Sequence, residues 1–401
     1  MTSPVPSVAA RTELREALAW LERFDGEILQ WQRALAAVPA PTGDERRRAD
    51  AVAQRFGALG LEEPARDAAG NVIARWPGSG GPGGAGVVIA AHLDTVFAAD
   101  TDLTVRHHGA RIVAPGISDN ARGLAGMLAL AGACRHAGIR PPAPITFVAT
   151  TGEEGAGDLA GARQLFADPG FRPLAFIALD GAGIERVVHR ALGSRRLRAV
   201  FRGPGGHSWA AFGVANPVHA VALASAAVGE LALPAAPRTT ASVVRIGGGS
   251  GLNTIPQEAW LDLDLRSEDE PTLDAVYGAA TEALARALDA ANRRRAAGTA
   301  PLTLQLVPLG YRPGGVTDAD HALVRHAVAA TRLVGHTADL AAASTDANVA
   351  ISRGVPGIAL GAGGRGGSTH LVSEWYENVD GPAGLYRALL VLAAAAGLGS
   401  S

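Results

Sequence analysis

The chain has 401 residues, which is too long for one compact core and predicts two or three domains. Its 48% hydrophobic and 18% charged residues exclude global disorder, and its formal net charge of −2 argues against binding to nucleic acids or anionic membranes. All 36 basic residues are arginine, which excludes a lysine Schiff base, and the single Cys134 excludes a disulfide framework or a cysteine metal cage.

The N-terminal segment lacks the basic-then-apolar order of a secretory signal. No continuous apolar run reaches the roughly 18 residues that a membrane span needs. We therefore expect a soluble, cytoplasmic protein with neither a membrane nor a nucleic acid as its partner.

In chain order, the spacing of apolar residues first predicts a helix over residues 12–38. Thr42 and Glu45 have the spacing of a capping box, in which two side chains cap the first turn of a helix. This pair predicts a second helix that reaches about residue 59.

Four short apolar runs follow, at residues 87–91, 145–150, 174–179 and 355–360. Each run is continuous rather than alternating, as in strands that are buried on both faces of a mostly parallel sheet. A helical segment at residues 119–137 separates the first two runs. This βαβ pattern predicts an α/β domain with a mostly parallel sheet flanked by helices.

A second domain is predicted within the first. We expect strands at residues 197–201, 241–246, 259–265 and 302–307. Helices are expected at residues 217–231, between the first and second strands, and at 271–295, between the third and fourth. The order β-α-β-β-α-β is that of a ferredoxin-like unit. The predicted boundaries are 1–193 and 311–401 for the first domain and 194–310 for the inserted one.

Polar side chains follow the predicted buried strands. They are His92 and Asp94 after the first, Glu153 and Glu154 after the second, Asp180 after the third, His370 beyond a glycine-rich loop after the fourth, and Asp119 at the start of the intervening helix. Because ligands of open α/β sheets bind outside the carboxyl ends of the strands, these side chains should converge. Two imidazoles and several carboxylates without a thiolate indicate a zinc, cobalt or manganese site.

The number of donors indicates two ions, since a single catalytic metal usually takes three protein ligands. Two ions about 3.5–4 Å apart would share a bridging carboxylate. Neighbouring Glu153 and Glu154 point in different directions, so one can bind metal while the other handles a proton. Asp94 lies two residues beyond His92 on an extended segment and can orient its ring.

Taken singly, these residues have ordinary structural explanations. His92 alone would be a loop histidine, Glu153 and Glu154 a solvated loop or the first turn of a helix, Asp119 an N-cap and Asp180 a turn residue. These separate explanations do not account for the fact that the residues occur at the ends of successive strands.

The sequence resembles the co-catalytic zinc exopeptidases and deacylases, a family with peptidase T, glutamate carboxypeptidase, acetylornithine deacetylase and succinyl-diaminopimelate desuccinylase. The resemblance rests on AHLDTV (91–96), GISDN (116–120), TGEEG (151–155), LDG (179–181), GGHS (205–208), LNTIP (252–256), STDAN (344–348), GGSTH (366–370) and EW (374–375). An aspartate at position 180, and the segments around STDAN and GGSTH, are most similar to the peptidase T branch.

The resemblance implies two divalent ions, with zinc expected first and manganese or cobalt as alternatives. The implied roles are His92 and Asp180 for one ion, Glu154 and His370 for the other, Asp119 as the bridge, Asp94 orienting His92, and Glu153 as general base. Leu371 departs from the family, in which threonine or serine often follows the last histidine.

The inserted domain would be the family's lid and dimerisation domain, which implies a homodimer. There, His207 would polarise the scissile carbonyl, often in the active site of the partner subunit. Asn253 and Arg266 match positions that contact substrate, and Arg266 would bind a carboxylate.

These observations predict hydrolysis of amide bonds in short peptides by a di- or tripeptidase or an aminopeptidase. An N-acyl-amino-acid deacylase with the same metals is the alternative, and a non-catalytic peptide-binding protein is a more distant one. The intact base Glu153 argues against the latter. A glycosidase that uses Glu153 and Glu154 is disfavoured, because neighbouring residues seldom place carboxyls on opposite sides of one bond.

Overall fold

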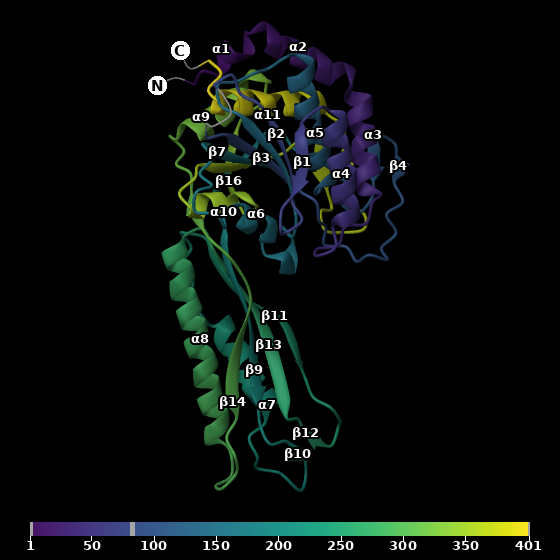
Figure 1. Cartoon of the computed structure of the whole chain (residues 1–401). Helices are drawn as coiled ribbons and strands as arrows, with labels where there is room; N and C mark the ends of the chain where they lie inside the picture. The colour runs from purple at the N-terminus through teal and green to yellow at the C-terminus, as the bar shows by residue number, and fades with distance from the viewer. Residues whose placement is uncertain (1–2, 81–84, 400–401) are drawn as a thin grey trace. The chain divides into compact units, whose positions relative to one another are not determined.

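The computed structural model describes residues 3–80 and 85–399, which form two compact units. Unit 1 comprises the residues up to Ala191 and those from Val316 onward, and unit 2 comprises Leu192–Gly315. Figure 1 labels the helices and strands of both units.

Unit 1 is built on a nine-stranded sheet within the described residues, with the order β1-β2-β6-β3-β7-β17-β8-β15 and with β16 paired to β8. The strands are β1 Glu62–Arg66, β2 Val72–Trp76, β6 Ile145–Thr150, β3 Val87–His92, β7 Ala175–Leu179, β17 Gly357–Leu360, β8 Arg186–Ala191, β15 Gly315–Val316 and β16 Asp339–Ala343. The four central strands β6, β3, β7 and β17 are parallel. These are the four apolar runs of the sequence, so the predicted mostly parallel sheet is confirmed.

Helices cover both faces of this sheet (Figure 1). One face carries α1 Val5–Ala9, α2 Thr12–Arg23, α3 Asp25–Ala36, α4 Arg46–Ala58, α5 Ala121–His136, α9 Ala322–Leu333 and α11 Gly381–Ala395, and the other carries α6 Ala160–Leu165 and α10 Ala347–Ser352. Strand β3 shows why its run is continuously apolar. Val87 and Ile89 pack into the core on the first face, and Val88 and Ala90 pack into the core on the second.

Two expectations for the N-terminal region are wrong. The single helix predicted over residues 12–38 is two helices, α2 and α3, which meet at Phe24. The Phe24 ring stacks on Trp20 with 4.7 Å between centroids. Because both helices turn apolar residues toward the same core, the apolar spacing continues across the break.

The predicted capping box is absent. Helix α4 begins at Arg46, and no side-chain hydrogen bond caps its first turn. Instead the Thr42 hydroxyl donates to Asp94 Oδ2 at 2.9 Å, and Glu45 Oε1 accepts the N–H groups of Gly43 and Gly152 at 2.8 and 3.1 Å. Both side chains are therefore used in tertiary contacts.

A second, four-stranded sheet of unit 1 has the order β18-β19-β5-β4. Its strands are β18 Arg365–Gly367, β19 Trp375–Glu377, β5 Arg111–Val113 and β4 Arg106–His108. Pairing of β19 with β5 brings the segment after β5 beside the segment before β19, and Ala114 donates its N–H to the carbonyl of Glu374 at 3.0 Å. This contact places two distant parts of the sequence next to each other.

Unit 2 has the predicted β-α-β-β-α-β order. Its elements are β9 Gly193–Arg202, α7 Pro217–Gly229, β11 Thr239–Gly248, β13 Glu258–Ser267, α8 Glu270–Arg293 and β14 Thr303–Arg312. The strands form an antiparallel sheet in the order β11-β13-β9-β14, and alternate residues such as Leu197 and Leu263 pack against α7 and α8. A short pair, β10 Gly206–His207 with β12 Thr254–Ile255, extends from it.

Among the helices of the described residues, none has both the length and the apolar character that crossing a bilayer requires.

Candidate active site

The candidate site lies in unit 1, where the carboxyl ends of the central parallel strands meet. His92 is the last residue of β3, Glu153 and Glu154 follow β6, and Asp180 follows β7. Parallel strands end at one edge of their sheet, so this topology brings the four side chains together. Two further donors reach the same edge: Asp119 from the loop before α5, and His370 from the loop between β18 and β19.

The Asp119 carboxylate lies between the two histidines. Its Oδ1 is 2.9 Å from His92 Nε2, and its Oδ2 is 3.4 Å from His370 Nε2. His92 Nε2 also lies 3.9 Å from Asp180 Oδ1, and His370 Nε2 lies 2.9 Å from Glu154 Oε1. Each oxygen of Asp119 thus faces a different imidazole and carboxylate pair.

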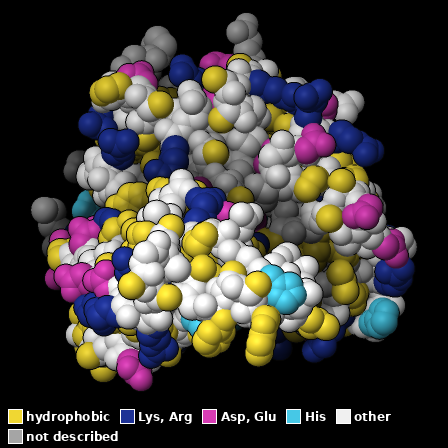
Figure 2. Space-filling view, turned by 90° about the horizontal axis from the view of Figure 1, so that it is seen from below, with side chains coloured by type: hydrophobic (Ala, Val, Ile, Leu, Met, Phe, Trp, Pro, Cys, Tyr) yellow, Lys and Arg dark blue, Asp and Glu magenta, His cyan; other side chains and the backbone are white. Residues whose placement is uncertain are grey.

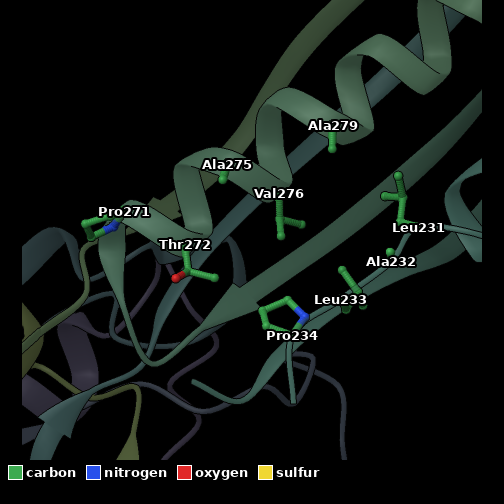
Figure 3. A pocket seen from close by; sticks show the side chains of 9 residues that line it. All are labelled: Leu231, Ala232, Leu233, Pro234, Pro271, Thr272, Ala275, Val276 and Ala279. Atoms are coloured by element: carbon green, nitrogen blue, oxygen red, sulfur yellow. The ribbon is translucent and has the colours of Figure 1, made fainter. Parts of the chain in front are cut away.

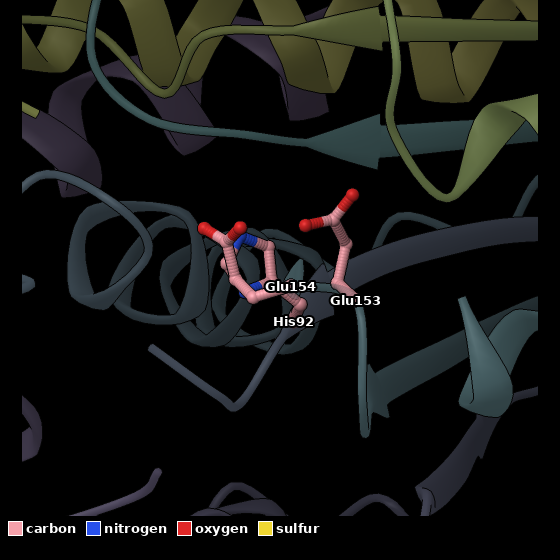
Figure 4. A group of neighbouring side chains, drawn as sticks. All are labelled: His92, Glu153 and Glu154. Carbon is pink, nitrogen blue, oxygen red and sulfur yellow. The ribbon is translucent and has the colours of Figure 1, made fainter. Parts of the chain in front are cut away.

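Three groups of donors are close enough to hold an ion. In each group the candidate ligand atoms lie within 4.8 Å of one another, and the groups are His92, Asp119 and Asp180; Asp119, Glu154 and His370; and His92, Glu153 and Glu154. Figure 4 shows the third group, in which the carboxylates of Glu153 and Glu154 lie apart from each other. The first two groups share Asp119.

The carboxylates of the site favour the protonated, positively charged forms of its two histidines. Burial alone would lower the pKa of His92, but its contacts with Asp119, Asp180 and Asp94 outweigh burial and hold the pKa well above its usual value. Hydrogen bonds to Asp119 and Glu154 raise the pKa of His370 to about 10. Within the described residues, Asp119, Asp180 and Glu154 form ion pairs with histidine only. Such a site suits a divalent cation that takes the place of these protons.

Asn120 fixes the distance between the Asp119 loop and the end of β7. Its Nδ2 donates to the carbonyl of Leu179 at 2.9 Å, and its Oδ1 accepts the N–H of Gly181 at 3.1 Å. The same Oδ1 accepts the N–H of Gly123 and caps α5. The N-cap of this helix is therefore Asn120, which leaves Asp119 to face the histidines.

Asp94 contacts both the His92 ring and the loop after β6. His92 Nδ1 lies 3.0 Å from the backbone carbonyl of Asp94 and 3.5 Å from its carboxylate. The carboxylate itself accepts the backbone N–H groups of Glu153 and Glu154 at 3.0 and 2.9 Å. It is fully buried, so these bonds fix the loop that carries both glutamates.

Glu374 is a buried residue of the site for which no role was predicted. Its carboxylate accepts the N–H groups of Gly116, Ser118 and Asp119 at 3.1, 2.8 and 2.7 Å. Burial raises its pKa to about 7. Its only signal in the sequence is its membership of the EW run that ends the family resemblance.

Asp346 is a second such residue. It is fully buried, burial raises its pKa to about 6, and its Oδ2 accepts a hydrogen bond from the hydroxyl of Thr150, the last residue of β6, at 2.5 Å. This bond ties the segment before α10 to the strand end that precedes Glu153. Its sequence signal is the STDAN run.

His207 and Asn253 lie together in unit 2. The pairing of β10 with β12 places His207 opposite Thr254, and Ser208 donates its N–H to the carbonyl of Asn253 at 2.8 Å. His207 Nδ1 accepts the N–H groups of Trp209 and Ala210 at 3.2 and 3.4 Å. In the neutral ring the proton is then on Nε2, which makes this nitrogen a donor.

Arg266, the predicted carboxylate ligand, is engaged within unit 2. Its Nε and Nη2 donate to Asp264 at 2.8 and 3.0 Å, and Asp264 also lies 3.3 Å from Arg196 Nε. Both contacts are on the face of the sheet away from α7 and α8.

Unit 2 also contains an apolar pocket of about 460 Å³ beside α8 (Figure 3). Its lining residues are Leu231, Ala232, Leu233, Pro234, Pro271, Thr272, Ala275, Val276 and Ala279. None of them has a titratable side chain, so this pocket offers neither a metal ligand nor an acid or base. The candidate metal-binding groups of the described residues all lie at the sheet edge of unit 1.

Comparisons with known proteins agree with this geometry. The chain is similar in structure to aminopeptidase PepT from Bacillus cereus ATCC 10987, with a TM-score of 0.73, 22% identity and coverage of 94% of this chain and 99% of that one. A tripeptidase from Staphylococcus aureus subsp. aureus mu50 has a TM-score of 0.76 and 20% identity, over 92% of this chain and 98% of that one. An amidase of the hydantoinase/carbamoylase family from Burkholderia vietnamiensis has a TM-score of 0.67 and 18% identity, over 94% and 96%.

At these identities the three structures show a shared fold. No curated protein sequence matches the chain. Residues 88–396, which are most of the chain, match the family described as peptidase family M20/M25/M40. The chain therefore belongs to peptidase family M20/M25/M40 and is a hydrolytic metalloenzyme of that family.

Proposed function

We propose that this protein hydrolyses amide bonds of short peptides at a centre of two divalent metal ions. The observation that carries the proposal is the position of Asp119, whose two carboxylate oxygens face His92 and His370 separately. A carboxylate in this position can be shared by two neighbouring ions. A site for a single ion would not need a carboxylate whose two oxygens face two different histidines.

The donors fit two ions. His92, Asp119 and Asp180 would hold one, and Asp119, Glu154 and His370 would hold the other. Nitrogen and oxygen donors without a thiolate favour zinc, with manganese and cobalt as alternatives. Ions bound there would supply Lewis acidity and lower the pKa of water in the site.

Glu153 is proposed as the general base. Its carboxylate would take a proton from the attacking water and return it to the leaving nitrogen of the amide. It is 4% exposed, and an oxygen of its carboxylate lies within 4.8 Å of ligand atoms of His92 and Glu154. The bond from its backbone N–H to Asp94 fixes the backbone from which this side chain extends.

His207 is proposed as the donor that stabilises the oxyanion of the tetrahedral intermediate. Its Nδ1 accepts backbone hydrogen bonds, so Nε2–H is available to donate. Asn253 lies beside it and is proposed to contact substrate. Arg266 is proposed to contact a substrate carboxylate, although its Nε and Nη2 already bind Asp264.

Unit 2 is proposed to act as a lid and to form a homodimer. Three large apolar side chains near His207 are almost fully exposed, namely Trp209 at 87%, Phe212 at 88% and Leu252 at 109%. Figure 2, seen from the β10 and β12 end of this unit, shows hydrophobic side chains projecting there. Exposed apolar groups of this kind are typical of contact surfaces.

An N-acyl-amino-acid deacylase is the second candidate, and the structural similarity to an amidase favours it. Both reactions break an amide bond and would use the same metal ligands and Glu153. They differ only in whether the acyl part of the substrate has a free amine.

The test is a panel of free-amine di- and tripeptides and of N-acetyl and N-succinyl amino acids. The protein is stripped with EDTA, reloaded with zinc, manganese or cobalt, and the products are followed by mass spectrometry. Metal-dependent loss of the free-amine peptides is expected. Loss of only the N-acylated compounds would establish the deacylase instead, and binding of peptides without any hydrolysis would overturn both.

A further inference from the structure

A small cavity of unit 1 adjoins the proposed metal centre. It has a volume of about 200 Å³, and Asp180 is part of its wall. Because Asp180 is a proposed ligand, a substrate whose scissile bond lies at the ions can extend a neighbouring group into this cavity. A cavity of this size can hold several waters or one side chain of moderate length.

Small residues make this space. Ala359 of β17, Val188 of β8 and Ala343 at the end of β16 line the wall, together with Ala182 and Gly361. None of these side chains is long enough to fill the cavity. The polar part of the lining includes Ser344 and Thr345, from the segment before α10.

Arg186 is the basic residue of this wall. It is exposed, and its Nη2 donates to the carbonyl of Ala342 at 3.0 Å. Asp339 is opposite Arg186 in the register of β16 and β8, yet the guanidinium points to the other end of β16. No carboxylate among the residues that the structure describes lies within ion-pair distance of it.

We propose that this cavity is a substrate subsite in which Arg186 binds a carboxylate next to the scissile amide bond. The inference rests on the proposed function, because it places the scissile bond at the ions held in part by Asp180. The carboxylate can come from an acidic residue of a peptide or from a dicarboxylic acyl group such as succinyl. An arginine without a carboxylate partner supplies the planar pair of donors that a carboxylate accepts best.

The test compares pairs of substrates that differ only in this charge. The pairs are Glu-Ala with Gln-Ala, Ala-Glu with Ala-Gln, and N-succinyl-alanine with N-succinamoyl-alanine. The ratio of kcat/KM for the acidic to the neutral member is measured for the metal-loaded wild type and for Arg186→Gln, Arg186→Lys and Arg332→Gln. Arg332 is an exposed arginine of α9 outside the cavity and serves as the matched control.

We expect Arg186→Gln to lower the ratio about 10- to 100-fold in at least one pair, mainly through KM, since it removes one partner of a charge pair. Arg186→Lys should restore part of the ratio, and Arg332→Gln should leave it unchanged. The first two pairs decide on which side of the scissile bond the carboxylate lies, and the third tests the acyl source. Equal losses for both members of every pair, or no change at all, would overturn the subsite.

A binding experiment separates this inference from the proposed function. Calorimetry with L-glutamate, succinate and L-glutamine uses the metal-loaded wild type and Arg186→Gln. If the wild type hydrolyses no substrate but binds glutamate or succinate in preference to glutamine, and the variant loses this preference, the subsite stands although the proposed reaction fails. If the wild type hydrolyses peptides and neither the ratios nor binding depend on Arg186, the reaction stands and the subsite fails.

Discussion

The carboxylate of Glu374 accepts the backbone N–H of Asp119 at 2.7 Å, across 255 residues of sequence. The same Oε1 accepts the N–H of Ser118, and Oε2 accepts that of Gly116. Three charge-assisted bonds to one loop fix the backbone that carries the proposed bridging ligand. Changing a group that orients a metal ligand typically costs about 10- to 100-fold in metal affinity or activity.

Glu374→Gln should therefore weaken metal binding without removing a ligand. An amide retains one acceptor oxygen for the three donors and loses the charge, so we expect metal affinity or kcat/KM to fall about 10- to 100-fold. Competition with a chelator measures the affinity. Glu377→Gln removes a partly exposed carboxylate of β19, 3.9 Å from Arg111 of β5, and should change neither quantity. Equal effects of both substitutions would show that Glu374 has no special role.

The adjacent glutamates should respond differently to the same substitution. Glu153→Gln removes the proposed base, so kcat should fall about 10²- to 10⁴-fold while two metal ions remain bound. Glu154→Gln removes a proposed ligand, so the protein should bind its second ion more weakly. Elemental analysis of dialysed protein, together with kcat, separates the two effects. Loss of metal from Glu153→Gln and not from Glu154→Gln would reverse their assignments.

His207→Ala should be folded and severely impaired. Loss of one oxyanion donor typically lowers kcat about 10²- to 10³-fold. Circular dichroism and metal content should be those of the wild type, because the His207 side chain is exposed and the proposed ligands lie in unit 1. Turnover close to that of the wild type would remove His207 from the mechanism.

Stability should fall in mild acid because of His326. Burial, followed by the charges of Arg325 and His321, lowers its pKa to about 4 from the usual 6.5. Between pH 6.5 and 4 the unfolded chain binds a proton that the folded chain does not, so the free energy of unfolding decreases as pH falls through this window. The full loss is about 3 kcal/mol.

Urea unfolding of EDTA-treated protein at pH 7.5 and pH 4.5 measures this loss. His326→Asn should show a smaller decrease than the wild type, by about 3 kcal/mol at most. His108→Asn, at an exposed position of β4, should behave like the wild type. If the decrease is the same in all three proteins, His326 does not titrate as the structure indicates.

Much of the fold could be predicted because its signals are local. The strands β3, β6, β7 and β17 are buried on both faces, and burial on both faces is what makes a short run continuously apolar. Parallel strands end at a common edge, so the positions of His92, Glu153 and Asp180 after three such strands also predict that they lie close together. The break at Phe24 was missed because apolar periodicity persists through it.

The residues that support the site could not be predicted in the same way. Glu374 and Asp346 bind backbone N–H and hydroxyl groups far away in the sequence, and no spacing rule applies to such contacts. Glu45 has the position of a capping residue, yet it accepts the N–H of Gly152, 107 residues away. At Glu45 a tertiary donor thus takes the place of the local capping contact. Likewise, only the folded structure shows that Arg186 bonds to the carbonyl of Ala342 and to no carboxylate of the described residues.

The central claim is that two ions sharing Asp119 carry out the hydrolysis. The most direct measurement is a titration of metal-free protein with zinc, in which hydrolysis of a free-amine tripeptide is followed against equivalents of zinc bound per chain. We predict that activity rises until two equivalents are bound, and that Asp119→Asn prevents full activity at any zinc concentration. Full activity at one equivalent, with no further gain from a second, would contradict the account.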